Sequence, residues 1–145
     1  MTKLSPRLAA IVEALPLQPG MRVLEIGGAP GAAARAVSER IGPNGHILVI
    51  DRSAKGVALV ERNAAEEIAS GVLEVRQSAA EDFTLRPRQA PFDLAFAVRV
   101  GAFDGRHPRA GVLARARIRQ ALVPGGRLLV DGGTPLREID LAADG

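Results

Sequence analysis

The stretch "RVLEIGGAPGAAARAV" (residues 22–37) joins an apolar run to a glycine-rich turn and then to a series of alanines. Residues 22–26 form a short apolar segment bounded by glycines, as is typical of a buried strand. Residues 32–41 place apolar side chains at helical spacing and stop at Gly42, a residue type common just beyond a helix. The stretch therefore predicts a strand, a tight turn and a helix, the repeating unit of a parallel α/β sheet.

The same alternation of apolar runs and helical patterns continues on both sides of this unit. Further strands are expected at 45–50, 73–77, 92–98 and 127–131, and further helices at 6–15, from Ser53 to Gly71 and after Pro108. This pattern indicates an α/β fold with a three-layer, doubly wound, mostly parallel sheet. Ligands of such sheets bind beyond the carboxyl ends of the strands, where the strand order reverses. We expect one domain over residues 1–145, divided into an N-terminal helix and turn (1–20), a core (21–131) and a short tail (132–145).

The composition excludes several classes of protein. Cysteine is absent, which excludes disulfides, thiolate metal sites and cysteine nucleophiles, and two histidines cannot form a metal site without carboxylates. The net charge of +3 is mild and Tyr and Trp are missing, so we do not expect a nucleic acid partner. The chain has no apolar run near the roughly 20 residues that cross a bilayer and no signal-peptide pattern, so we expect a cytoplasmic protein without membrane contact.

Two kinds of ligand use a glycine turn after the first strand, namely dinucleotides and S-adenosylmethionine. A pyrophosphate requires free backbone amides at the turn. Pro30 removes one of them, Ala29 stands where a second glycine is usual, and Glu25 brings negative charge. S-adenosylmethionine carries a positive sulfonium and a positive ammonium, which a nearby carboxylate favours. The proline is tolerated if it lies in the first turn of the helix, where amides lack partners.

Three segments carry a resemblance to a known family. "VLEIGGAPG" resembles motif I of the class I S-adenosylmethionine-dependent methyltransferases, "ILVIDRS" is similar to their motif II, and "LVPGGRLLV" is similar to a later loop and strand. The resemblance covers about residues 5–131. It implies a Rossmann-like fold, S-adenosylmethionine as the cofactor, S-adenosylhomocysteine as the product, and methyl transfer as the activity.

The resemblance also implies which residues bind the cofactor. Glu25, Gly27, Gly28 and Gly31 would line the methionine end, Asp51 would bind the ribose, Arg52, Ala80 and Glu81 would border the adenine, and Val98 and Arg99 would lie beside the sulfonium. One position departs from the family pattern, because Ala79 occupies the place of the usual acidic residue near the adenine. We expect Glu81 to substitute for that acid.

No catalytic residue is assigned, because positioning can supply much of the rate of an in-line methyl transfer. His46 lies at the wrong end of the sheet, so His107 is the only histidine available as a general base. The Asn-Pro-Pro-Tyr motif of enzymes that methylate exocyclic amines is missing. RNA methyltransferases use catalytic lysines or cysteines, whereas this sequence has lysine only at positions 3 and 55 and has no cysteine. The expected acceptor is therefore a small molecule.

The C-terminal end departs from the family, whose core normally adds a helix and two strands after the fifth strand. Only 14 residues follow Asp131, enough for one short edge strand within 136–141. An exposed edge pairs readily, so a second copy of the chain is an expected partner, as a homo-oligomer through that edge. The alternative function is a truncated methyltransferase fold that binds the cofactor or assembles without catalysis. A dinucleotide-binding oxidoreductase and an RNA methyltransferase rank behind both.

Overall fold

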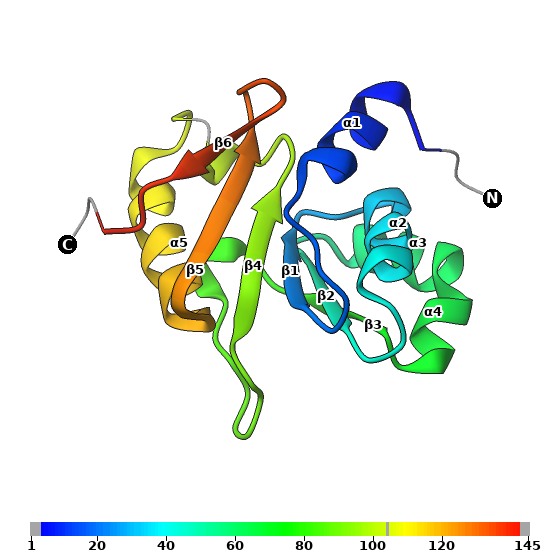
Figure 1. Cartoon of the computed structure of the whole chain (residues 1–145). Helices are drawn as coiled ribbons and strands as arrows, with labels where there is room; N and C mark the ends of the chain where they lie inside the picture. The colour runs from blue at the N-terminus through cyan, green and yellow to red at the C-terminus, as the bar shows by residue number, and fades with distance from the viewer. Residues whose placement is uncertain (1–3, 104, 143–145) are drawn as a thin grey trace.

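The computed structural model of the chain describes residues 4–103 and 105–142, so the ends of the expected N-terminal segment and tail, at 1–3 and 143–145, lie outside the described residues. Six strands form one sheet in the order β3-β2-β1-β4-β5-β6 (Figure 1). The strands are β1 (Arg22–Ile26), β2 (His46–Asp51), β3 (Leu73–Gln77), β4 (Phe92–Ala97), β5 (Leu122–Asp131) and β6 (Leu136–Ile139). All neighbouring pairs are parallel except β5 and β6, so the expected mostly parallel sheet is confirmed.

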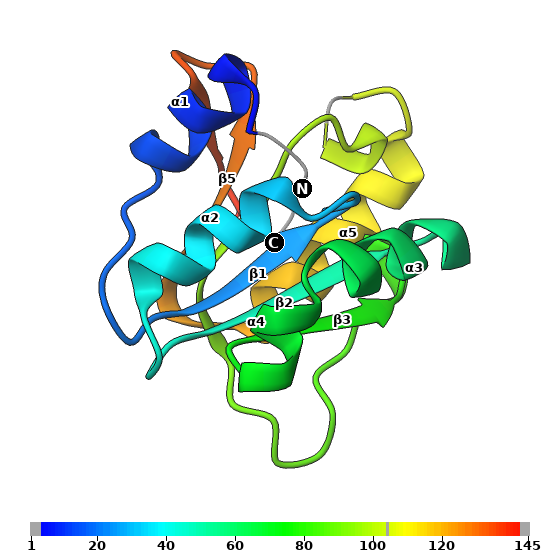
Figure 2. The same ribbon diagram turned by 90° about the vertical axis from the view of Figure 1, so that its right-hand side faces the viewer.

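Helices cover both faces of the sheet and make the three layers. The helices are α1 (Pro6–Ala14), α2 (Ala32–Ile41), α3 (Ala54–Asn63), α4 (Ala65–Ser70) and α5 (Pro108–Ala121), with 3₁₀ turns η1 (Ala80–Asp82) and η2 (Gly101–Phe103). The first four helices lie on one face and α5 lies on the other (Figures 1 and 2). The strand order reverses between β1 and β4, which places the expected ligand site at their carboxyl ends.

Local sequence signals set most of the helix ends. The Ser5 hydroxyl accepts a hydrogen bond from the Leu8 amide at 3.2 Å, and the Ser53 hydroxyl accepts one from the Gly56 amide at 3.1 Å. Both serines are therefore the N-caps of their helices, α1 and α3. The single helix expected from Ser53 to Gly71 is wrong, because it divides at Ala64 into α3 and α4. Ala64 leaves helical geometry (φ −113°, ψ 27°), and its methyl group lies fully buried in the apolar core.

The last two strands differ slightly from expectation. The fifth strand begins at Leu122, before the predicted 127–131, because Leu122 pairs with Phe92. The next four residues, 123–126, do not pair with β4, and pairing resumes between Arg127 and Leu94. The loop expected within "LVPGGRLLV" is therefore an irregularity inside β5. The short strand β6 runs antiparallel to β5 and fulfils the expectation of one edge strand within 136–141.

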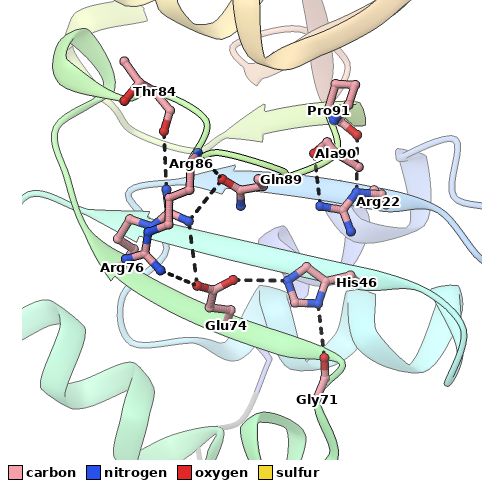
Figure 3. Close-up of polar contacts among 10 residues, drawn as sticks. All are labelled: Arg22, His46, Gly71, Glu74, Arg76, Thr84, Arg86, Gln89, Ala90 and Pro91. Carbon is pink, nitrogen blue, oxygen red and sulfur yellow. Dashed lines mark hydrogen bonds and ion pairs between the residues drawn. The ribbon is translucent and has the colours of Figure 1, made fainter.

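A loop at the amino-terminal end of β4, residues 83–91, is fixed to the sheet by arginines and is called the pinned loop here (Figure 3). Arg76 on β3 donates to the Thr84 carbonyl at 3.5 Å and to the Gln89 side-chain oxygen at 3.3 Å. Its guanidinium also lies 5.4 Å from the centre of the Phe83 ring.

His46 contacts Glu74 and the Gly71 carbonyl in the same region (Figure 3). This histidine therefore lies at the end of β2 opposite its carboxyl end, as the sequence predicted.

Candidate functional site

Two adjoining cavities open at the carboxyl ends of β1 and β4. The first, called the glutamate cavity, has a volume of about 360 Å³ and is lined by Ser5, Arg7, Leu8, Ile11, Glu25, Gly27, Gly28, Ala29, Pro30, Ala32, Ala33, Val98 and Arg99. The second, called the aspartate cavity, has a volume of about 500 Å³ and is lined by Ile26, Gly27, Asp51, Arg52, Ser78, Ala79, Ala80, Glu81, Arg99, Val100, Gly101, Ala102, Arg106, His107 and Ala110. Because Gly27 and Arg99 line both, the two cavities meet at these residues.

Glu25 is the most unusual residue of the site. It lies on β1 with only 4% of its surface exposed, and its Oε1 atom has no hydrogen-bond partner. Burial, and then the neighbouring Asp51 carboxylate, raises the pKa of Glu25 from 4.5 to about 8. An acid with a strongly raised pKa beside a cavity is a feature of functional sites. A cationic group beside Oε1 would supply the missing partner and favour the ionised carboxylate.

The glycines of the turn are required by close contacts and by backbone geometry. At Gly28 a β-carbon would lie 2.6 Å from Val49 Cγ1 and 2.7 Å from the Glu25 carboxyl carbon. Gly27 has φ +70°, and a β-carbon there would lie 2.9 Å from Val100 Cγ2. Glycine at these positions therefore lets the turn fold directly over the buried acid.

Two details of the turn correct the sequence analysis. Pro30 precedes Gly31, which is the N-cap of α2, so the proline does not lie in the first turn of the helix as expected. Gly31 is needed for its left-handed φ of +107°, since a β-carbon there would meet other atoms only at ordinary contact distance. Gly31 lines neither cavity, unlike the other predicted site residues.

Asp51, at the end of β2, is held by backbone amides. Its Oδ1 accepts from the Ser53 amide at 3.0 Å, and its Oδ2 accepts from the Ala29 amide at 3.3 Å. A β-carbon at Gly56 would lie 2.6 Å from Asp51 Oδ1, so the first turn of α3 must be free of a side chain there. The carboxylate therefore joins the glycine turn to α3 and has a fixed position.

The remaining predicted residues lie after the carboxyl ends of the strands β2, β3 and β4. Arg52, Ala80 and Glu81 share the aspartate cavity with Asp51, and Val98 lines the glutamate cavity. Arg99 follows β4 with a φ of +59°, which is uncommon for a residue with a side chain. Such strained backbone is frequent at functional sites.

His107 lies in the aspartate cavity, as the N-cap residue of α5. Its exposed imidazole therefore lies on the Asp51 side of the site. The glutamate cavity has no histidine among the described residues that line it. No group of metal-ligating side chains occurs within residues 4–103 and 105–142. Over the same residues, no helix has the length and apolar character to cross a membrane.

Sequence reasoning missed the wall that α1 gives to the glutamate cavity. Ser5, Arg7, Leu8 and Ile11 all line it. The Nη2 of Arg7 lies 2.9 Å from the Asp131 Oδ2 at the end of β5, and Asp131 Oδ1 accepts from the Arg99 amide at 3.0 Å. These residues are far apart in sequence, and an N-terminal arginine on an amphipathic helix gives no local signal of such a role.

Comparison with known proteins agrees with the fold described above. The family model described as "Methyltransferase domain" matches residues 23–126. The protein-L-isoaspartate O-methyltransferase of Methylorubrum populi is 38% identical over 128 residues, which are 88% of this chain and 52% of that protein. The ubiquinone/menaquinone biosynthesis C-methyltransferase UbiE of Bordetella avium is 31% identical over 79% of this chain and 41% of its own length. The chain thus spans about half the length of these curated relatives.

Solved structures show the same fold. Haemonchus contortus phosphoethanolamine N-methyltransferase 2 in complex with S-adenosyl-L-methionine has a TM-score of 0.65 and 25% identity, over 86% of this chain and 27% of that one. A SAM-dependent methyltransferase from Aquifex aeolicus has a TM-score of 0.66 and 19% identity, over 85% of this chain and 62% of that one. With the match over residues 23–126 and the sheet described above, the chain belongs to the methyltransferase domain family, as a Rossmann-like, class I member of the kind that depends on S-adenosylmethionine.

Proposed function

We propose that the chain binds S-adenosylmethionine across the two cavities and transfers its methyl group to a small-molecule acceptor. The observation that carries the proposal is Glu25, a buried acid whose unpartnered Oε1 lies in the wall of a cavity. A cationic ligand gives this atom a partner, whereas a pyrophosphate would repel it. The glycine turn over Glu25 lets a ligand approach the backbone closely.

The residues of the two cavities are proposed to bind different parts of the cofactor. Glu25, Gly27 and Gly28 would face the methionine end, Asp51 the ribose hydroxyls, Arg52, Ala80 and Glu81 the adenine, and Val98 and Arg99 the sulfonium. Support comes from their arrangement, because the Glu25 and Asp51 sides are separate cavities that meet at Gly27. Gly31 would act indirectly, by shaping the start of α2.

Bound S-adenosylmethionine supplies a methyl group on a positively charged sulfur. The chain would contribute mainly position, by holding the cofactor over the ends of β1 and β4. The titratable side chains that line the glutamate cavity within the described residues are Arg7, Glu25 and Arg99. Glu25 is proposed to hold the cofactor, and no His, Lys or Tyr lines the cavity within the described residues to remove a proton from the acceptor. This lining favours an acceptor that is already anionic or an unprotonated amine, which requires no proton removal.

A second acceptor class is an isoaspartyl carboxylate in a protein. It is favoured by the name of the Methylorubrum populi relative, which is 38% identical to this chain. Incubation with methyl-labelled S-adenosylmethionine and either a mixture of small carboxylic acids and amines or an isoaspartyl peptide separates the two classes. Label in the peptide alone would replace the small-molecule proposal with the protein acceptor.

Isothermal calorimetry with S-adenosylhomocysteine tests the binding site itself. The Asp51→Ala variant should bind roughly ten- to a hundredfold more weakly, since it loses hydrogen bonds to the ribose that involve a charged group. Asp82→Ala is the matched control, because Asp82 is an exposed acid of η1 outside both cavities. Absence of binding to the unchanged protein at millimolar ligand would end the proposal, and tighter binding of NADH would indicate a dinucleotide site.

A further inference from the structure

We propose that Arg7, on the first turn of α1, binds the carboxylate of the cofactor's methionine end. The inference rests on the proposed function and adds to it a residue from outside the sheet and its loops. It gives α1 a role in ligand binding besides covering α2 (Figure 2).

The glutamate cavity has walls of opposite charge. Glu25 lies on the β1 side, under the glycine turn, and Arg7 lies on the α1 side. The methionine end of the cofactor is an α-amino acid, which carries an ammonium and a carboxylate on the same carbon. An acid on one wall of the cavity and a guanidinium on the opposite wall match this pair of charges. If Glu25 takes the ammonium, the carboxylate needs a donor from another wall.

Arg7 is already held at the rim of the cavity. The apolar side of α1 anchors the helix, since Ile11, Val12 and Leu15 are almost completely buried. The Arg7 Nη2 then bonds to Asp131 Oδ2 at 2.9 Å. A guanidinium has further N–H donors beyond the one engaged by Asp131, so it can bind a second carboxylate without losing the first.

Arg99 is the other arginine of this cavity, but its position favours a different part of the ligand. Arg99 lines both cavities and therefore lies at their junction. Arg7 lines the glutamate cavity alone, away from Asp51. The amino-acid carboxylate is the end of the cofactor farthest from the ribose. The placement of the two side chains therefore assigns that end to Arg7.

The Arg7 side chain is suited to replacement without unfolding the protein. It is 52% exposed and its partner Asp131 is 20% exposed, and ion pairs at such exposed positions add little stability. The chain also offers a matched control on the same helix. Arg40 of α2 pairs with Glu13 of α1, outside both cavities. Loss of this second ion pair removes a contact between α1 and α2 without changing the lining of the cavity.

The test compares two ligands by calorimetry with unchanged protein, Arg7→Gln and Arg40→Gln. S-adenosylhomocysteine has the amino-acid end, whereas 5′-methylthioadenosine lacks it. The Arg7→Gln variant should bind S-adenosylhomocysteine about tenfold more weakly and change 5′-methylthioadenosine binding by less than about twofold. The Arg40→Gln variant should bind both ligands as the unchanged protein does. Arg7→Lys should recover part of the loss, because it keeps the charge.

Two results would overturn the inference while leaving the proposed function intact. One is an Arg7→Gln variant that binds S-adenosylhomocysteine as tightly as the unchanged protein. The other is a loss that is not specific to Arg7 and the amino-acid end, seen as an equal loss for both ligands or as the same loss in Arg40→Gln, since it would show that α1 acts by packing alone. Failure of both ligands to bind the unchanged protein would reject the proposed function itself, and the inference with it.

Discussion

Replacing Glu25 by Gln should remove most of the pH dependence of folding stability that this site creates. Burial, and then the Asp51 charge, raises the pKa of Glu25 from 4.5 to about 8 in the folded protein. Between these values the folded protein holds a proton that the unfolded chain has released, so its stability falls as the pH rises through this window. The loss is about 1.4 kcal/mol for each pH unit. Over the whole window the loss in the free energy of unfolding approaches roughly 5 kcal/mol. The contribution of Glu25 to stability is complete only below about pH 4.5.

Urea denaturation between pH 5 and pH 8.5 measures this effect. Circular dichroism is the suitable signal, because the chain contains neither Trp nor Tyr. The Glu25→Gln variant should become steadily more stable than the unchanged protein as the pH rises, since its amide cannot ionise. Glu39→Gln is the matched variant, because it removes an exposed carboxylate of α2 instead. Parallel stability curves for Glu25→Gln and the unchanged protein would refute the reasoning.

Other changes test other parts of the structure. Binding of S-adenosylhomocysteine at pH 6.5 should release up to about one proton from Glu25, seen by calorimetry in buffers of different ionisation enthalpy, and no release would contradict ionisation on binding. Gly28→Ala should lower the free energy of unfolding by about 1 to 3 kcal/mol, because its β-carbon would lie 2.7 Å from the Glu25 carboxyl carbon. A urea midpoint equal to that of the unchanged protein would show that the turn can shift to accommodate the β-carbon. Gly56→Ala should weaken S-adenosylhomocysteine binding by displacing Asp51, and unchanged calorimetric affinity would argue against that contact. Arg76→Met should speed trypsin cleavage within the pinned loop, which loses two hydrogen bonds, whereas an unchanged rate would mean that other contacts hold it.

The sequence predicted the strands well because each is a short apolar run between glycines or other turn residues. Residues 22–26 and 73–77 became strands with the predicted ends. Glu25 and Asp51 were assigned to the cofactor through the resemblance, and the structure brings them to one edge of the sheet because the carboxyl ends of the parallel strands β1 and β2 meet there. The local sequence pattern therefore predicts which residues lie at the end of a strand.

The sequence did not predict features that depend on contacts between distant segments. The pairing of Arg7 with Asp131 joins residues 124 positions apart. The left-handed backbone of Arg99 occurs together with a hydrogen bond that its amide donates to that same Asp131, and no sequence signal marks either feature. Gly27 and Gly28 line the glutamate cavity, but the need for glycine at position 28 comes from a close approach to Val49 and Glu25 that exists only in the folded sheet. Local patterns specify elements, whereas these contacts arise when elements pack.

The two cavities hold their acids in opposite ways, and this difference bears on how affinity is distributed along the ligand. Asp51 accepts hydrogen bonds from two backbone amides, and its carboxylate is therefore fixed before any ligand binds. Glu25 is buried without a partner for Oε1, so the folded protein keeps an unfavourable group that a cation would relieve. A ligand that reaches only the Asp51 side gains the preorganised contacts alone. A ligand with an ammonium also gains the relief at Glu25, so the amino-acid end should contribute more to affinity than its few atoms suggest.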